Sequence, residues 1–172
     1  MAAVIIHDSN PFLPPPEDRD PVRRLRGRLP APVSVWTSAD GAARDGWTIS
    51  SMLVADGEPS ELVALVNEDA SWWDLFRRTG LACVNVLATG QAMVSEVFAR
   101  MAPSPGGPFR TGEWTQTPYG PRLVGGAAWA GVRLIDPEPK HSGWGLLVRA
   151  RIESLELTEG GVALLHRGGR YS

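Results

Sequence analysis

The feature that most constrains the fold of this chain is a succession of short apolar runs separated by glycine, proline and asparagine. Stretches such as PVSVW, ELVALV and LACVNVL are five to seven residues long and rich in valine. Runs of this kind, bounded by turn residues, are typical of β-strands. We therefore expect strands over residues 30–40, 46–56, 61–67, 81–89, 122–137, 142–159 and 161–172, and a further short strand around Trp114.

Three other segments carry helical signals. VRRLRGRL follows Pro21, and proline is favoured in the first turn of a helix. SWWDLFRRTG has Ser71 as its expected N-cap and Gly80 as its stop. QAMVSEVFARM is expected to place three apolar residues on one face: Met93, Val97 and Met101. Strands that outnumber helices and mostly short connections predict a mainly β protein, an antiparallel β-barrel with accessory helices.

A length of 172 residues suits one compact domain. Residues 1–20 contain the Pro14 to Pro16 run followed by EDRD, which is typical of an extended arm, and we expect this arm to lie on a partner subunit. The folded domain is expected to span residues 21–172. The N-terminus has no basic region before its short apolar run, so it does not predict a signal peptide.

Charge and cysteine content limit the classes of function. The formal net charge is −2, which provides no overall attraction to nucleic acid or to an anionic membrane, and no window approaches the roughly 20 apolar residues of a membrane span. Cys83 is the single cysteine and lies in an apolar run, so a buried structural thiol is favoured over a nucleophile. The predicted location is the reducing cytoplasm.

Metal and nucleophile signatures are missing from the sequence. The three histidines, His7, His141 and His166, are far apart and none has a second ligand at metal spacing, so no metal site is predicted. There is no GxSxG, no GxxxxGK[ST] and no GxGxxG between a strand and a helix. The remaining signal is a set of hydroxyl and amide groups at strand ends, clearest in GWTISS (46–51), and this pattern favours binding over covalent catalysis.

Several motifs occur in a fixed order along the chain: GWTISS, NEDASWW, CVNVL, SEVFA, YGPRLVGGAAW and LLHRGGRYS. In this order they resemble the flavin reductase-like family, whose members fold as an antiparallel Greek-key split β-barrel that binds FMN. The resemblance covers about residues 24–171. It implies FMN as cofactor, with FAD as an alternative, and NAD(P)H as co-substrate.

The resemblance also implies the residues of the flavin site. By the period of two in a strand, Thr48 and Ser50 are expected on one face, and the amides at the start of the 71–80 helix are expected to face the phosphate. Three arginines are candidates to neutralise that phosphate: Arg77, Arg78 and Arg100. The expected cofactor-binding residues are Trp47, Thr48, Ile49, Ser50, Ser51, Asn67, Ser71, Trp72, Asn85 and Arg100.

Two departures from the family pattern affect the nicotinamide side. Where many members have Gly-Asp-His, this chain has Gly143, Trp144 and Gly145, and His141 is displaced by about four residues. Trp144 and His141 are therefore the nicotinamide-side candidates, with a plug at the barrel end as the structural alternative for Trp144. The loop VADGEPS also lacks the serines that the family commonly carries there.

The leading hypothesis is an FMN-dependent NAD(P)H oxidoreductase, a flavin reductase that supplies reduced flavin to a partner monooxygenase. Two alternatives remain open: a flavin carrier or storage protein without a nicotinamide site, and an oxidoreductase of the same fold that uses another redox partner such as a deazaflavin. A homodimer is also expected, since seven tryptophans exceed what a core of this size usually needs. Three of them are candidates to cover the subunit boundary: Trp36, Trp114 and Trp129.

Overall fold

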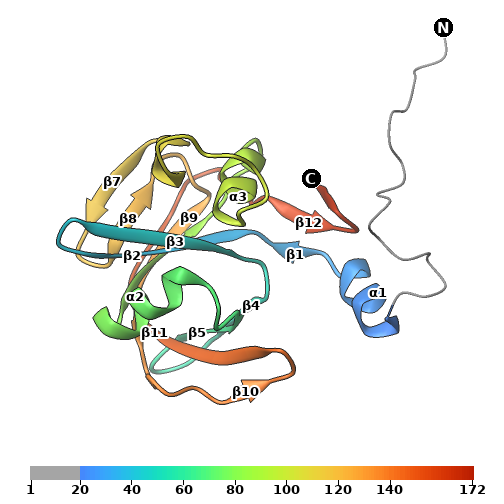
Figure 1. The fold of residues 1–172 in the computed structure, drawn as a ribbon, viewed down its shortest axis with the longest axis horizontal. Coiled ribbons are helices and arrows are strands. Elements are labelled where there is room, and N and C mark those ends of the chain that lie inside the picture. Colours follow the sequence, from blue (N-terminus) through green and yellow to red (C-terminus); the bar gives the residue numbers. More distant parts are fainter. Residues whose placement is uncertain (1–19) are drawn as a thin grey trace, which may run out of the picture.

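The computed structural model describes residues 20–172, which form an antiparallel β-barrel flanked by short helices (Figure 1). The predicted arm over residues 1–20 lies outside the described residues except for Asp20. The helices are α1 (Pro21–Arg28), α2 (Ser71–Thr79), α3 (Ala92–Phe98) and the 3-10 turn η2 (Pro108–Arg110). The barrel strands are β2 (Ser34–Asp40), β3 (Ala43–Ile49), β4 (Met52–Ala55), β5 (Glu61–Val66), β6 (Leu81–Val86), β9 (Ala128–Leu134) and β11 (Gly145–Leu157).

The remaining strands are short and decorate the barrel. They are β1 (Ala31–Pro32), β7 (Trp114–Thr117), β8 (Gly120–Leu123), β10 (His141–Ser142), β12 (Leu165–Arg167) and β13 (Arg170–Tyr171). β7 confirms the short strand expected around Trp114, and β10 pairs with the start of β11. The runs 122–137 and 161–172, each expected to be one strand, are instead divided by turns at Gly125 and at Gly168 and Gly169, all three of which adopt positive φ.

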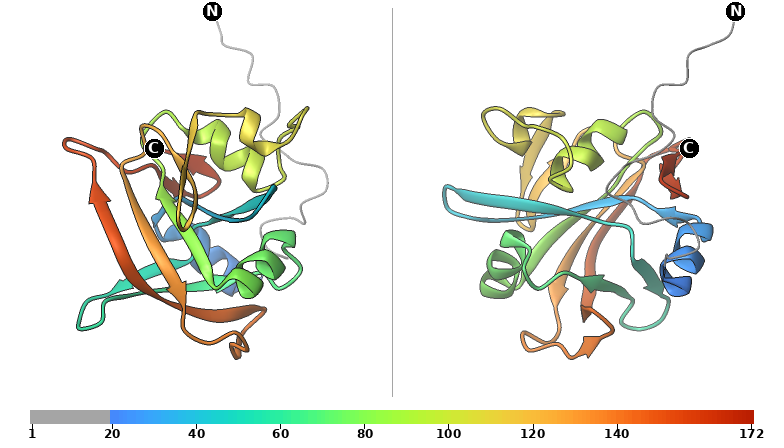
Figure 2. Two further views of the ribbon diagram at one scale, coloured as in Figure 1. Left: turned by 90° about the vertical axis from the view of Figure 1, so that its left-hand side faces the viewer. Right: turned by 45° about the vertical axis from the view of Figure 1, so that its right-hand side comes forward.

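The main sheet runs in the order β3-β2-β6-β9-β11-β5-β4, with every pair antiparallel. The two edge strands, β3 and β4, are joined by only Ser50 and Ser51, so the chain itself carries the sheet round into a barrel (Figure 2). β6 returns beside β2 after β3, β4 and β5, which is the Greek-key order. The predicted mainly β split barrel is therefore confirmed.

The run 46–56, expected to be one strand, is interrupted at Ser50 and Ser51. β3 pairs with β2 before the interruption, and β4 pairs with β5 after it. The corner is fixed by two hydrogen bonds, because Leu65 N–H donates to the Ser51 carbonyl at 2.9 Å and Ser51 Oγ donates to the Leu65 carbonyl at 2.8 Å. At Ser50 and Ser51 the chain therefore leaves its pairing with β2 and begins to pair with β5, and the strand is not continuous.

The core of the barrel is filled by aromatic and aliphatic side chains from α2 and the strands. Trp36, Trp72 and Phe76 are fully buried there, and the rings of Trp72 and Phe76 stack with centroids 5.0 Å apart. Trp36 is therefore wrong as a candidate for a subunit boundary. Trp114 is half-buried in a second cluster beneath α3, and Trp129 is half-buried under the guanidinium of Arg122.

The helices follow the sequence signals with two corrections. α2 ends at Gly80 in the left-handed conformation, as predicted, but its N-cap is Ala70, so the prediction of Ser71 as N-cap is wrong. The expected apolar face of α3 is also wrong, because Met93 is 60% exposed and Met101, which lies beyond the helix, is 75% exposed. The face that packs on the barrel consists of Val94, Ser95, Val97 and Phe98.

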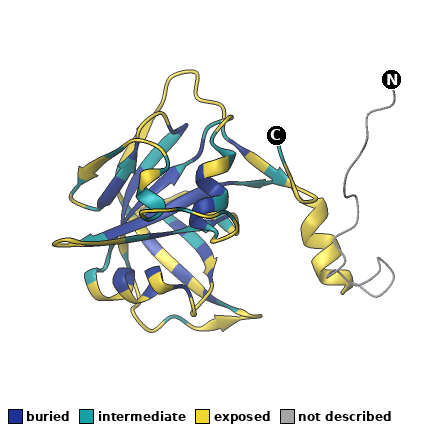
Figure 3. Ribbon diagram, turned by 45° about the horizontal axis from the view of Figure 1, so that its top comes forward, coloured by how far each residue is buried: buried dark blue, intermediate teal, exposed yellow. Residues whose placement is uncertain are grey.

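α1 confirms the predicted helix and has Asp20 as its N-cap, but none of its residues is buried (Figure 3). It lies on the same side of the barrel as the β12–β13 hairpin (Figure 1). A backbone hydrogen bond from Gly168 N–H to the Gly27 carbonyl at 2.8 Å ties the hairpin to the helix. This contact, close to the β3–β4 corner, forms one wall of the site described next.

Candidate functional site

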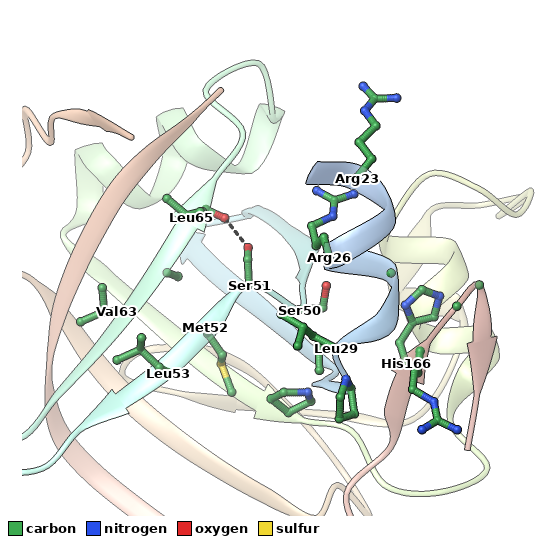
Figure 4. Close-up of a pocket in the computed structure, with 18 of the residues that line it drawn as sticks. Arg23, Arg26, Leu29, Ser50, Ser51, Met52, Leu53, Val63, Leu65 and His166 are labelled. Carbon is green, nitrogen blue, oxygen red and sulfur yellow. Dashed lines mark hydrogen bonds between the residues drawn. The ribbon is translucent and has the colours of Figure 1, made fainter. Parts of the chain in front are cut away.

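A groove of about 740 Å³ lies between α1, the outer face of β4 and β5, and the β12–β13 hairpin (Figure 4). Its volume is within the range of small-molecule sites. Its apolar lining comes from the segment 29–32 that follows α1 and from three adjacent strands: Met52, Leu53, Val63, Ala64, Leu65 and Leu147. The hydroxyls of Ser50, Ser51 and Ser142 and the side chains of Arg23, Arg26, His166 and Arg167 also line it.

Ser50 and Ser51 are both in the groove because the strand is interrupted there. The expectation that Thr48 and Ser50 share one face is wrong, since a period of two requires an unbroken strand and β3 ends at Ile49. The Ser51 hydroxyl donates its hydrogen bond to the Leu65 carbonyl, so towards a ligand it can act only as an acceptor. Ser50 is exposed and stands at the middle of the groove (Figure 4).

Thr48 and Ile49 have internal contacts. Thr48 Oγ1 donates to the Ser95 carbonyl of α3 at 2.7 Å, so its hydroxyl holds the helix against β3. Ile49 is 3% exposed and packs in the barrel core, and its carbonyl accepts a hydrogen bond from Ser34 Oγ at 2.7 Å. Neither side chain lines the groove.

Trp47, Ser71 and Arg100 are brought together, but around Asp45 and outside the groove. The Asp45 carboxylate accepts hydrogen bonds from Arg100 Nη2 at 2.7 Å and from Ser71 Oγ at 2.6 Å. The Arg100 guanidinium also lies 5.6 Å from the ring centre of Trp47. Arg100 adopts a φ of 61°, which is uncommon for a residue other than glycine. The charges of Arg100 and Asp45 therefore neutralise each other within this cluster.

The side chains of the other expected cofactor residues, Trp72, Asn85 and Asn67, make hydrogen bonds within the protein. Trp72 is fully buried and its Nε1 donates to Ser38 Oγ at 3.1 Å. Asn85 is 1% exposed and joins three strands through its amide. Asn67 closes an exposed turn by accepting the Asp69 N–H at 3.0 Å. None of the three lines the groove, and any contact of theirs with a flavin stays a prediction.

The arginines expected to meet a phosphate are already paired with carboxylates. Arg77 lies 3.8 Å from Asp74 and 3.7 Å from Glu138, and Arg78 lies 3.2 Å from Asp40. These ion pairs are exposed to solvent and lie at the end of α2. Arg100 is paired with Asp45 as described above.

The sequence reasoning missed the basic side chains that do line the groove. The run RRLRGR predicts a helix, and the closing RGGRY is part of a family motif, but neither by itself predicts a groove. The available signal was the density of arginine in both segments. What joins them is the tertiary contact between α1 and the C-terminal hairpin, which no local pattern shows.

The nicotinamide-side candidates lie at the border of the groove. His141 Nε2 is 3.2 Å from Glu68 Oε1, with both side chains largely exposed. Trp144 is 98% exposed at the tip of the β10–β11 turn, so it does not plug the barrel end. Only their neighbour Ser142 reaches the groove lining. The structure therefore leaves both side chains outside the groove.

Tyr171 anchors the hairpin wall of the groove. Its hydroxyl donates to the Glu96 carboxylate of α3 and lies 3.1 Å from Ser95 Oγ. Burial, and next the hydrogen bond to Glu96, raise the pKa of the Tyr171 hydroxyl above its ordinary value. Its ring also packs at 5.1 Å from that of His166, which faces the groove.

The chemistry of the groove fits a flavin. An isoalloxazine ring requires apolar walls and hydrogen-bond partners at its edge, and the β4–β5 surface with Ser50 and Ser51 supplies both. The described residues hold no group of three or more metal-ligand side chains. Across residues 20–172, the helices are too short and too polar to cross a membrane.

Fold and groove together define an antiparallel split-barrel protein with a largely apolar groove at the Ser50–Ser51 corner. The chain belongs to the flavin reductase like family, since the model of the flavin reductase like domain matches residues 26–172. This match confirms the resemblance seen in the motifs.

Individual relatives agree with this assignment. The chain is 32% identical over 115 residues to an FMN reductase (NADH) RutF of Variovorax paradoxus, a match that covers 67% of this chain and 63% of that protein. Among solved structures, it is similar to the NADH:FAD oxidoreductase SgcE6 of Streptomyces globisporus (TM-score 0.79, 22% identity, 95% of this chain and 98% of that chain). BorF, the flavin reductase component of a bacterial two-component tryptophan halogenase, is also similar (TM-score 0.75, 23% identity, 88% and 96% coverage). These structural likenesses show a shared fold.

Proposed function

We propose that this protein is an NAD(P)H-dependent flavin reductase that uses FMN, or FAD as an alternative, and supplies reduced flavin to a partner monooxygenase. The observation that carries the proposal is the groove at the Ser50–Ser51 corner in a chain that belongs to the flavin reductase like family. Two similar proteins support it: one is named an FMN reductase (NADH), and the other is the reductase component of a two-component halogenase.

The groove residues are suited to binding and orientation. When bound, a flavin accepts a hydride from the nicotinamide, a transfer that requires no acid or base from the protein. Ser50 and Ser51 hold the polar edge of the ring, while Leu53, Leu65 and Leu147 exclude water from one of its faces. A reaction of this kind explains why the groove contains hydroxyls and apolar side chains without a catalytic triad.

The direct test is steady-state oxidation of NADH and of NADPH by the purified protein with added FMN, compared with the background of free flavin. Ser50→Ala with Ser51→Ala should weaken FMN binding by about 5-fold to 150-fold, the equivalent of about 1–3 kcal/mol for two neutral hydrogen bonds. Ser154→Ala is the matched control, because Ser154 lies on β11 outside the groove lining. Unchanged affinity in the double variant would place the flavin elsewhere.

One observation favours the alternative of a flavin carrier or of a same-fold oxidoreductase with another redox partner, such as a deazaflavin. His141, the nearest substitute for the family histidine, faces Glu68 outside the groove. A wild-type protein that binds FMN and oxidises neither nucleotide above background would support this alternative and contradict the reductase proposal.

We also propose that the protein is a cytoplasmic homodimer. α1 presents Val22 and Leu25 to solvent, which are 70% and 59% exposed, and Leu29, directly after the helix, is 58% exposed. A helix of 8 residues with no buried side chain is marginal by itself, so a second copy that covers this stripe would stabilise it. Light scattering at micromolar concentration should give twice the chain mass, and Leu25→Glu should shift the protein toward monomer.

A further inference from the structure

A buried serine on β2 contacts both ends of the corner that carries Ser50 and Ser51. Ser34 is 0% exposed and is opposite Ile49 in the pairing of β2 with β3. Its Oγ donates to the Ile49 carbonyl at 2.7 Å and lies 3.3 Å from the thioether sulfur of Met52. Ile49 is the last residue of β3 and Met52 is the first residue of β4, so one hydroxyl contacts both residues that flank the corner.

The Ser34 hydroxyl is itself held from the barrel core. The fully buried Trp36 donates from its Nε1 to Ser34 Oγ at 3.1 Å. A hydroxyl that accepts an N–H keeps its own proton for an acceptor, here the Ile49 carbonyl. Because buried donors and acceptors are costly to leave unpaired, this chain of two hydrogen bonds opposes any displacement of the backbone that enters the corner.

The other side of the corner is held by β5. Ser51 and Leu65 exchange the two hydrogen bonds described above, one of which is drawn in Figure 4. Ser50 and Ser51 lie outside the strands and are both exposed. The position of their hydroxyls therefore depends on what holds the two ends of the corner: Leu65 on the groove side and Ser34 inside the barrel.

From these contacts we propose that Ser34 is a positioning residue of the flavin site. It lies outside the groove lining and fixes Ser50 and Ser51 from inside the barrel. The inference rests on the proposed function and adds to it a residue that acts through the corner. Loss of the Ser34 hydroxyl lowers the fraction of molecules in which the corner has the binding geometry, and ligand affinity falls in proportion to that fraction.

β2 itself provides the matched control. Ser38 is also 0% exposed, and its Oγ accepts the Trp72 Nε1–H at 3.1 Å and donates to the Leu81 carbonyl at 2.8 Å. These are the same kinds of contact, with a buried indole and a backbone carbonyl, but Ser38 is opposite Asp45, before the end of β3, and does not line the groove. Ser34→Ala and Ser38→Ala should therefore lower the melting temperature by similar amounts, roughly 2–12 °C.

FMN titration separates a positioning role from a general effect on stability. Ser34→Ala should weaken FMN binding by about 3-fold to 10-fold, the effect of roughly one hydrogen bond, while Ser38→Ala keeps the wild-type affinity. In the FMN-free protein, the Leu65 amide donates to the Ser51 carbonyl, so its hydrogen exchange should be faster in Ser34→Ala than in Ser38→Ala. Ser34→Cys places a weak donor at the same position and should lower FMN affinity in the same direction, so the test does not depend on Ser34→Ala alone.

A double-mutant cycle shows whether Ser34 acts through the corner. In Ser50→Ala with Ser51→Ala, the hydroxyls that Ser34 positions are absent. Adding Ser34→Ala to this variant should therefore weaken FMN binding by less than about twofold more.

The outcomes separate this inference from the proposed function. Equal losses of FMN affinity in Ser34→Ala and Ser38→Ala, or a Ser34→Ala effect that persists in full without the two corner hydroxyls, would show that Ser34 serves only the fold. Unchanged FMN affinity or unchanged Leu65 exchange in Ser34→Ala would also overturn the inference. In each of these cases, oxidation of NADH or NADPH by the wild type with FMN still supports the proposed function. A wild type that binds no FMN overturns both.

Discussion

Replacement of Asn85 by alanine tests whether this amide serves the fold or a ligand. Its Nδ2 donates to the Val35 carbonyl at 3.1 Å and approaches the Pro121 carbonyl at 3.4 Å, and its Oδ1 accepts the Leu123 N–H at 2.7 Å. In Asn85→Ala the Pro121 carbonyl keeps the Thr37 hydroxyl, but the buried Leu123 N–H loses its acceptor.

The magnitude follows from these contacts. A buried unsatisfied N–H costs about 1–3 kcal/mol, and the small cavity left by the amide adds about 1 kcal/mol. The free energy of unfolding of Asn85→Ala should therefore fall by about 2–4 kcal/mol, which lowers the melting temperature of a chain of this size by roughly 4–16 °C. Thermal unfolding followed by tryptophan fluorescence measures this change.

Asn67→Ala is the matched control, since it removes the same amide from an exposed turn and should cost less than about 1 kcal/mol. Asn67→Ala controls the stability measurement only, and FMN titration of Asn85→Ala completes the experiment. If Asn85→Ala keeps the wild-type melting temperature and loses FMN affinity, the amide contacts the ligand as the family resemblance implied, and the structural argument is refuted.

Three further predictions concern the fold around the site. Because burial raises the pKa of the Cys83 thiol to about 12, a thiol reagent should label the native protein negligibly and label one thiol after unfolding; rapid native labelling would contradict this. The raised pKa of Tyr171 contributes stability that is fully present below pH 10.0 and is lost as the pH rises through the folded-state pKa, so Tyr171→Phe should flatten the fall of melting temperature above pH 10.0. An equal alkaline fall in both proteins would count against the Tyr171–Glu96 contact. In Gly46→Ala the new methyl lies 2.9 Å from the Phe98 ring, which should cost about 1–3 kcal/mol in urea unfolding; an unchanged midpoint would show that the ring moves freely.

The local elements were predictable where neighbouring residues alone determine them. Pro21, Gly80 and the apolar runs predicted α1, the end of α2 and most barrel strands, and the structure confirms these. The face of α3 was not predictable, because Met93 and Val97 satisfy the helical period equally well and only the position of the barrel decides which side is buried.

The candidate site likewise has some features that the sequence predicts and others that only the tertiary structure decides. The sequence alone predicted the family, and it named Ser50 and Ser51, which line the groove, because the motif order is a property of the chain itself. Tertiary structure decided everything that depends on partners remote in sequence. It paired Arg100 with Asp45, assigned Asn85 to the join between strands, and brought Arg26 and Arg167 to one groove, since charge pairing and burial arise only when distant segments meet.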